Sequence, residues 1–119
     1  MRGFLFAATA AALMVLASPA LAHARLQHAS PGVGATVHVA PTTLQLTFDD
    51  DVEPARSAVT LTDVGGGAVA LGALTVSQDG LTLSAPIRSR MAPGAYQVHW
   101  RAVSIDGHTT SGDFAFRVG

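Results

Sequence analysis

Short apolar runs separated by turn residues are the feature that most restricts the fold of this chain. Leu44 to Phe48 alternates apolar and polar residues, which is typical of a strand with one buried and one exposed face. Similar runs follow, and turn sequences such as Gly65-Gly66-Gly67 and Asp79-Gly80 separate them. From residue 23 onward, no stretch keeps a helical period. The pattern therefore predicts an all-β fold.

The runs also define individual strands. The longest predicted strand extends from Tyr96 to Ser104, and its alternate residues share one apolar face with Trp100. The other predicted strands are 44–48, 58–62, 68–71, 74–77, 81–83 and a last one with Phe114, Phe116 and Val118 on its core face. About seven short strands at this spacing predict a two-sheet β-sandwich or a small barrel.

The start of the chain has the features of a secretory signal peptide. Arg2 supplies a positive charge, Phe4 to Leu16 is an almost unbroken apolar run, and Ala20-Leu21-Ala22 is a small-residue cleavage site. The run is shorter than the ~20 residues of a spanning helix. An uncleaved N-terminal anchor is the alternative. We expect residues 1–22 to be removed and residues 23–119 to be exported as one domain.

The composition of residues 23–119 excludes some partners. This part of the chain has six Arg and no Lys against seven Asp and one Glu, so no basic patch points to nucleic acid. Its length is that of one small domain. The chain has no cysteine, so an exported domain of this size depends on packing and on any metal that it binds.

Cleavage after Ala22 would make His23 the first residue of the mature protein. A terminal histidine has two nitrogen donors, the α-amine and the imidazole, which together can chelate a metal ion. The backbone nitrogen of an internal histidine is an amide and cannot take part in this way. Removal of the predicted signal peptide would therefore create a candidate metal ligand.

A second pair of donors lies near the C-terminus. Asp106 and His108 are two residues apart, and residues at this spacing point to the same face of an extended chain. The alternative is that Asp106-Gly107 only forms a tight turn with His108 in solvent. With His23, the pair would supply three nitrogens and one oxygen. That set suits tetragonal Cu(II), and zinc would accept the same ligands in tetrahedral geometry.

Several motifs occur together along the chain. They are His23-Ala24, Ser30-Pro31, Phe48 followed by acidic residues, Tyr96-x-Val98-x-Trp100-Arg101-Ala102-Val103-Ser104, Asp106-x-His108 and Ser111-Gly112-x-Phe114-x-Phe116. With these motifs, the chain resembles the CopC family of periplasmic copper-binding proteins of bacterial copper resistance and uptake. The resemblance covers nearly all of residues 23–119. It implies a small Greek-key β-sandwich of the immunoglobulin-like kind.

The resemblance also implies a set of site residues. His23, Asp106 and His108 match the ligands of one Cu(II) ion per chain. Asp50 falls where many members carry a glutamate near the copper. It is either a partner that orients a ligand or an ordinary solvated carboxylate. Met91 is the single methionine after residue 22, so we expect a packing residue there and no methionine-rich Cu(I) site.

Three further histidines, His28, His38 and His99, have no other donor at ligand spacing. We expect them at the surface, without a role in metal binding.

The function implied by the resemblance is that of a periplasmic Cu(II) carrier or buffer in copper homeostasis, not an enzyme. Its implied partner is a membrane copper transporter of the CopD type, and we expect a monomer. One alternative is a copper-dependent oxidative enzyme, because a terminal histidine plus a second histidine also resembles the copper brace of enzymes that cleave polysaccharides oxidatively. The other is an adhesion or accessory β-sandwich with incidental histidines.

Overall fold

The computed structural model describes residues 23–119, so the predicted signal peptide, residues 1–22, lies outside the described residues. None of the described residues belongs to a helix that is long and apolar enough to cross a membrane. Residues 23–119 form nine strands: β1 (Leu26–Ser30), β2 (Thr36–Val37), β3 (Thr43–Phe48), β4 (Ala58–Asp63), β5 (Ala68–Val69), β6 (Thr75–Val76), β7 (Thr82–Pro86), β8 (Gly94–Val103) and β9 (Thr109–Val118).

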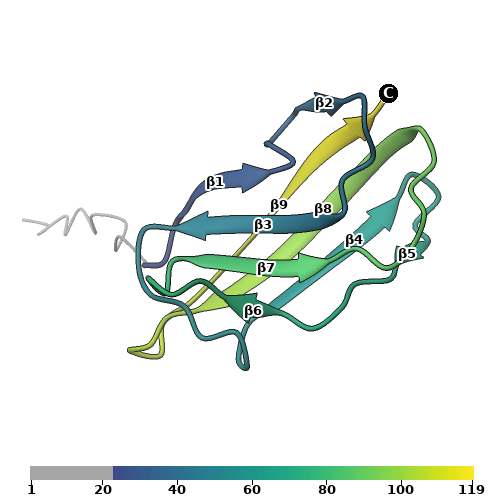
Figure 1. The fold of residues 1–119 in the computed structure, drawn as a ribbon. Coiled ribbons are helices and arrows are strands. Elements are labelled where there is room, and N and C mark those ends of the chain that lie inside the picture. Colours follow the sequence, from purple (N-terminus) through teal and green to yellow (C-terminus); the bar gives the residue numbers. More distant parts are fainter. Residues whose placement is uncertain (1–22) are drawn as a thin grey trace, which may run out of the picture.

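The strands form two sheets that face each other (Figure 1). One sheet has the order β1-β3-β7-β6 and the other has the order β2-β9-β8-β4-β5. All neighbouring strands are antiparallel except β2 and β9. The chain crosses between the sheets at every connection except β4–β5, β6–β7 and β8–β9, and the crossings resemble those of a Greek key. The prediction of an all-β sandwich is thereby confirmed.

The number and the boundaries of the strands differ from the sequence prediction. The described part of the chain has nine strands and not about seven, because β1 and β2 come before the first strand of the predicted set. The predicted strands 68–71 and 74–77 are present, but β5 and β6 have only two residues each. β9 begins at Thr109, well before the apolar residues that marked it, because its polar first half continues the ladder with β8. Pairing with a neighbour thus defines strands that hydrophobic alternation does not show.

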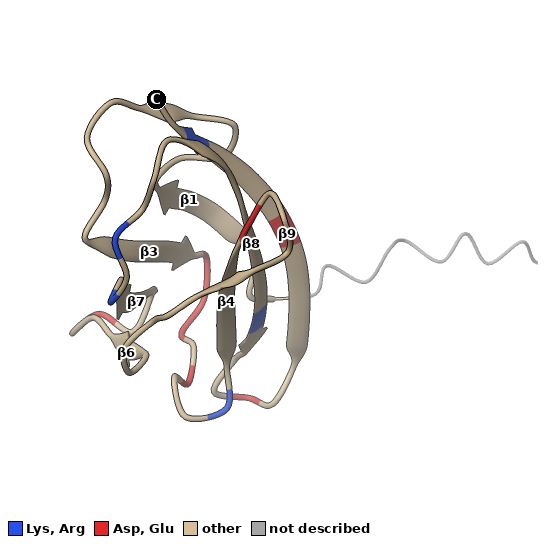
Figure 2. Cartoon of the chain, turned by 90° about the vertical axis from the view of Figure 1, so that its right-hand side faces the viewer, with Lys and Arg blue, Asp and Glu red and all other residues tan. Residues whose placement is uncertain are grey.

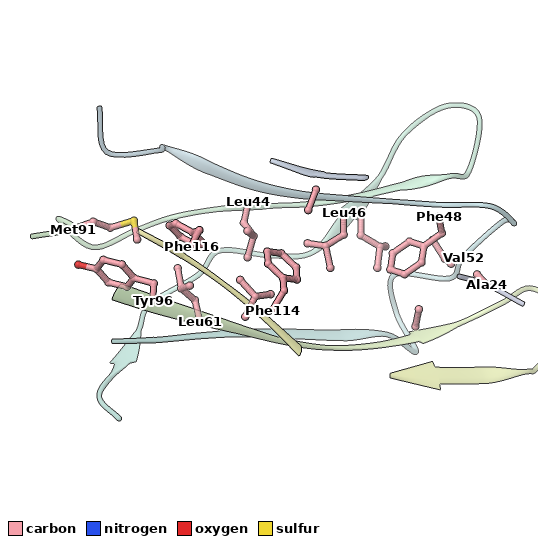
Figure 3. Close-up of a cluster of buried hydrophobic side chains, with 14 of the residues drawn as sticks. Ala24, Leu44, Leu46, Phe48, Val52, Leu61, Met91, Tyr96, Phe114 and Phe116 are labelled. Atoms are coloured by element: carbon pink, nitrogen blue, oxygen red, sulfur yellow. The ribbon is translucent and has the colours of Figure 1, made fainter. Parts of the chain in front are cut away.

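The core lies between the sheets (Figure 3). The inward face predicted for the longest strand is correct, since Tyr96, Val98 and Ala102 on β8 are buried. Tyr96 stacks on Phe116 with ring centroids 5.7 Å apart. Met91 is only 6% exposed and joins this core, which confirms that it is a packing residue.

Gly112 leaves the space that the Trp100 side chain fills. The two residues face each other across β8 and β9, and a Cβ atom on Gly112 would lie 2.7 Å from Cζ2 of the indole. The indole in turn packs edge-on against Phe48, with ring centroids 5.2 Å apart. A side chain at position 112 would therefore displace the ring from the core.

We expect Gly112→Ala to lower the free energy of unfolding by about 1–3 kcal/mol, the usual cost of overpacking. Urea unfolding followed by Trp100 fluorescence measures it. Gly32→Ala is the matched control, because a Cβ there meets its nearest neighbour, the Cβ of Ala35, at an ordinary 3.6 Å. Equal losses in the two variants would contradict this account of Gly112.

Candidate metal centre

Three segments that are distant in sequence meet at one end of the sandwich. They are the segment that starts at His23, the residues that follow β3, and the turn between β8 and β9 (Figure 1). Ile105 in the turn donates a backbone hydrogen bond to Asp51 at 3.1 Å. The hydroxyl of Thr110 on β9 donates to the carbonyl oxygen of Ala24 at 2.6 Å. The fold therefore brings the predicted ligands to the same end of the molecule.

The turn between β8 and β9 is built around the buried side chain of Ser104. Its hydroxyl donates a hydrogen bond to the Asp106 carboxylate, and the backbone N–H of His108 donates to the same hydroxyl oxygen at 3.2 Å. Gly107 has a φ of 91°, in the left-handed region that favours glycine. The tight turn that the sequence suggested is therefore present.

The same turn brings two predicted ligands together. Nδ1 of His108 lies 3.1 Å from Oδ2 of Asp106, and the two side chains are 70% and 56% exposed. Contact through Nδ1 leaves Nε2 of His108 as the nitrogen that can bind a metal, an arrangement common among metal-binding histidines. The tight turn and the carboxylate–imidazole pair thus exist together.

The environment of Asp106 favours its charged form. The Ser104 hydroxyl is the main cause of a lowered pKa of the Asp106 carboxyl, and the backbone N–H and imidazole of His108 lower this pKa further. The lowered pKa means that the folded turn gains stability from the carboxylate above the ordinary aspartate pKa of ~3.9. This gain is lost as the pH falls through the lowered pKa.

His23 has a carboxylate neighbour of its own. Its Nδ1 lies 3.6 Å from Oδ2 of Asp49, and the two side chains are 55% and 27% exposed. The carboxylate of Asp50 instead accepts a 2.8 Å hydrogen bond from the backbone N–H of Asp51. The sequence analysis did not single out Asp49, although its position after the buried Phe48 would turn it away from the core.

The candidate donors stand as two separate pairs, His23 with Asp49 and Asp106 with His108. Between residues 23 and 119, no three His, Cys, Asp or Glu side chains form a ready-made metal site. The donor types, imidazole nitrogen and carboxylate oxygen, nevertheless fit Cu(II). Both imidazoles are mostly exposed and can therefore turn toward a metal ion.

The remaining histidines, His28, His38 and His99, are exposed, which confirms the prediction that they lie at the surface. His99 does have an acidic partner, because its Nδ1 is hydrogen-bonded to Asp113 on the neighbouring strand. The sequence analysis missed this pair, since only the register of β8 and β9 places the two residues side by side.

Comparison with known proteins agrees with this fold. Residues 26–119 match the CopC domain. Protein YobA of Escherichia coli K12 is 37% identical over 98 residues, which cover 82% of this chain and 79% of YobA. Copper resistance protein C of Xanthomonas campestris pv. juglandis is 32% identical over 113 residues, which cover 90% of this chain and 88% of that protein.

The crystal structure of CopC from Methylosinus trichosporium OB3b matches this structure with a TM-score of 0.75 at 32% identity, covering 81% of this chain and 93% of that one. The relatives whose names describe a role are copper resistance and copper transport proteins and not enzymes, in agreement with the expectation that this chain is not an enzyme. The sequence match over residues 26–119 and the shared β-sandwich show that the chain belongs to the CopC family.

Proposed function

We propose that this protein is a periplasmic Cu(II) carrier or buffer in copper homeostasis, that it begins at His23 once residues 1–22 are removed, and that it acts as a monomer. The observation that carries the proposal is the meeting of the His23–Asp49 and Asp106–His108 pairs at one end of the sandwich. Copper is the metal because the donors suit Cu(II) and because a relative covering 90% of this chain is a copper resistance protein.

The proposed ligands have distinct tasks. The free amine of His23 and its own Nδ1 form a chelate, because Nδ1 is the ring nitrogen nearer to the backbone. Nε2 of His108 supplies the third nitrogen, and the carboxylate of Asp106 supplies an oxygen. Asp106 can keep the hydrogen bond from Ser104 and still bind a metal, since an ionised carboxylate has about four acceptor positions. Its contact with Nδ1 of His108 is given up when the exposed imidazole turns its Nε2 to the same metal. We retain Asp50 as a residue that orients a ligand through hydrogen bonding.

The charge at this end of the molecule favours a divalent cation. Acidic residues line the connection that follows β3 (Figure 2), and the carboxylates of Asp49 and Asp106 lie in the two histidine pairs. Concentrated negative charge raises the local concentration of cations. The exposed imidazoles also suit a carrier, which must take up copper and release it again. We infer from the family resemblance that a membrane transporter of the CopD type receives or supplies this copper.

Calorimetry and electron paramagnetic resonance test the proposal on protein that mass spectrometry shows to begin at His23. We expect one Cu(II) per chain in a tetragonal site, and no thiolate charge-transfer band because the chain has no cysteine. Cu(I) should bind much more weakly, since Met91 is buried. Tight Cu(I) binding that is lost in Met91→Leu would contradict the proposal, as would displacement of Cu(II) by an equal concentration of zinc.

A further inference from the structure

Ala24 and Arg25, the two residues that follow the proposed N-terminal His23, are held by three kinds of contact. The side chain of Ala24 is fully buried at the Phe48 end of the core (Figure 3). The carbonyl oxygen of Ala24 accepts the 2.6 Å hydrogen bond from the hydroxyl of Thr110. The backbone N–H of the next residue, Arg25, donates to Oδ1 of Asp49 at 2.6 Å, and the backbone N–H of Asp49 donates back to the carbonyl oxygen of Arg25 at 3.0 Å.

These contacts come before the regular strand. The ladder of β1 with β3 begins at Leu26, so Ala24 and Arg25 are fixed ahead of it by side chains of two other segments. The ends of a chain are usually poorly ordered unless specific contacts hold them. Here the contacts hold the residue that is bonded directly to His23.

The same contacts join the two halves of the proposed copper site. Thr110 is two residues after His108, a separation of about 7 Å along a strand. Asp49 contacts the backbone of Arg25 through Oδ1 and lies 3.6 Å from the imidazole of His23 through Oδ2. One end of this connection therefore reaches the terminal histidine, and the other reaches the turn that contains Asp106 and His108.

We propose that Thr110 and Asp49 are positioning residues for copper binding, which hold the mature N-terminus so that His23 faces Asp106 and His108. This inference rests on the proposed function. Ordering a backbone costs conformational entropy. If folding has already fixed Ala24 and Arg25, the metal does not have to order them, and a pre-organised site binds more tightly.

The inference is tested on protein that begins at His23, in the parent form and as Thr110→Val, Thr110→Ser and Thr109→Val. Valine keeps the branched shape of threonine and removes the hydroxyl, whereas serine keeps the hydroxyl. Thr109→Val is the matched control, because Thr109 is the exposed neighbour on the same strand. Two quantities are measured: hydrogen exchange of the Arg25 amide without copper, and the Cu(II) dissociation constant by chelator competition.

Thr110→Val should speed exchange at the Arg25 amide and weaken Cu(II) binding by about 10-fold, the lower end of the range for outer partners of metal ligands. Thr110→Ser keeps the hydroxyl and should leave both the exchange rate and the Cu(II) affinity close to those of the parent protein. Thr109→Val should change neither quantity. Asp49→Ala removes the acceptor of the Arg25 amide and should also speed exchange at this amide and weaken Cu(II) binding. If Thr110→Val does not fold, Asp49→Ala takes its place in the test.

Faster exchange with unchanged copper affinity would overturn the inference, because the contacts would then serve the fold alone. An equal loss of affinity in Thr109→Val, or no change in any variant, would overturn it as well. If the parent protein does not bind Cu(II), the proposed function is refuted, and this inference with it. That outcome differs from the others because the parent and all variants then fail to bind Cu(II) alike.

Discussion

One extra residue in front of His23 is expected to weaken Cu(II) binding by at least ~100-fold, since even outer partners of metal ligands are worth about 10–100-fold. The extension, Gly or Met, turns the α-amine of His23 into an amide nitrogen and so removes the two-nitrogen chelate. The imidazole of His23 and the side chains of Asp106 and His108 all remain. Calorimetry of the two forms under identical conditions measures the difference.

The pH dependence provides an independent check on this variant. A free α-amine has an ordinary pKa of ~7.7–8.0 and must lose its proton to bind a metal. The affinity of the protein that begins at His23 should therefore fall as the pH drops below this range. The extended form should lack the part of this dependence that comes from the amine. Equal Cu(II) affinities in the two forms would rule out the N-terminal chelate.

His108→Ala is expected to lower Cu(II) affinity by a similar factor and to leave the fold of the copper-free protein nearly intact. The side chain of His108 is 70% exposed, so its removal leaves no cavity in the core. Asp106→Ala should have a smaller effect on affinity and should alter the spectrum, because water can replace a carboxylate ligand. Competition titrations measure the affinities, and urea unfolding measures the stability.

His38→Ala and His99→Ala are the matched controls, because both side chains are exposed. They should bind Cu(II) as tightly as the parent protein. Similar losses on removal of each of the five histidines would instead indicate nonspecific binding to surface imidazoles.

The fold was predictable where side-chain alternation marks the core. β3 and β8 follow directly from their alternating residues, because one face of each strand is buried. β2 was not predictable, since it has two residues and exists only through its pairing with β9. The strands 68–71 and 74–77 were predicted, but the pairing of β5 and β6 with their neighbours limits each to two residues. Met91 could be assigned to the core by elimination, because one methionine cannot form a methionine-rich site.

The candidate site was predictable only where it is local. Asp106 and His108 are two residues apart, and the turn between β8 and β9 does bring them together. The bond from Thr110 to Ala24 spans 86 positions, and the pair of His99 and Asp113 spans 14. Such contacts depend on the order and register of the strands, and neither can be read from a single sequence.

The most direct test of the terminal chelate is the electron paramagnetic resonance spectrum of the Cu(II) protein that begins at His23, prepared with histidine labelled with ¹⁵N only at the backbone nitrogen. The other four histidines are internal, so their labelled nitrogens are amides, and only His23 offers a labelled amine. We predict that the nitrogen hyperfine pattern changes from three ¹⁴N donors to two ¹⁴N and one ¹⁵N. A pattern identical to that of the unlabelled protein would contradict the central claim that the amine of His23 binds copper.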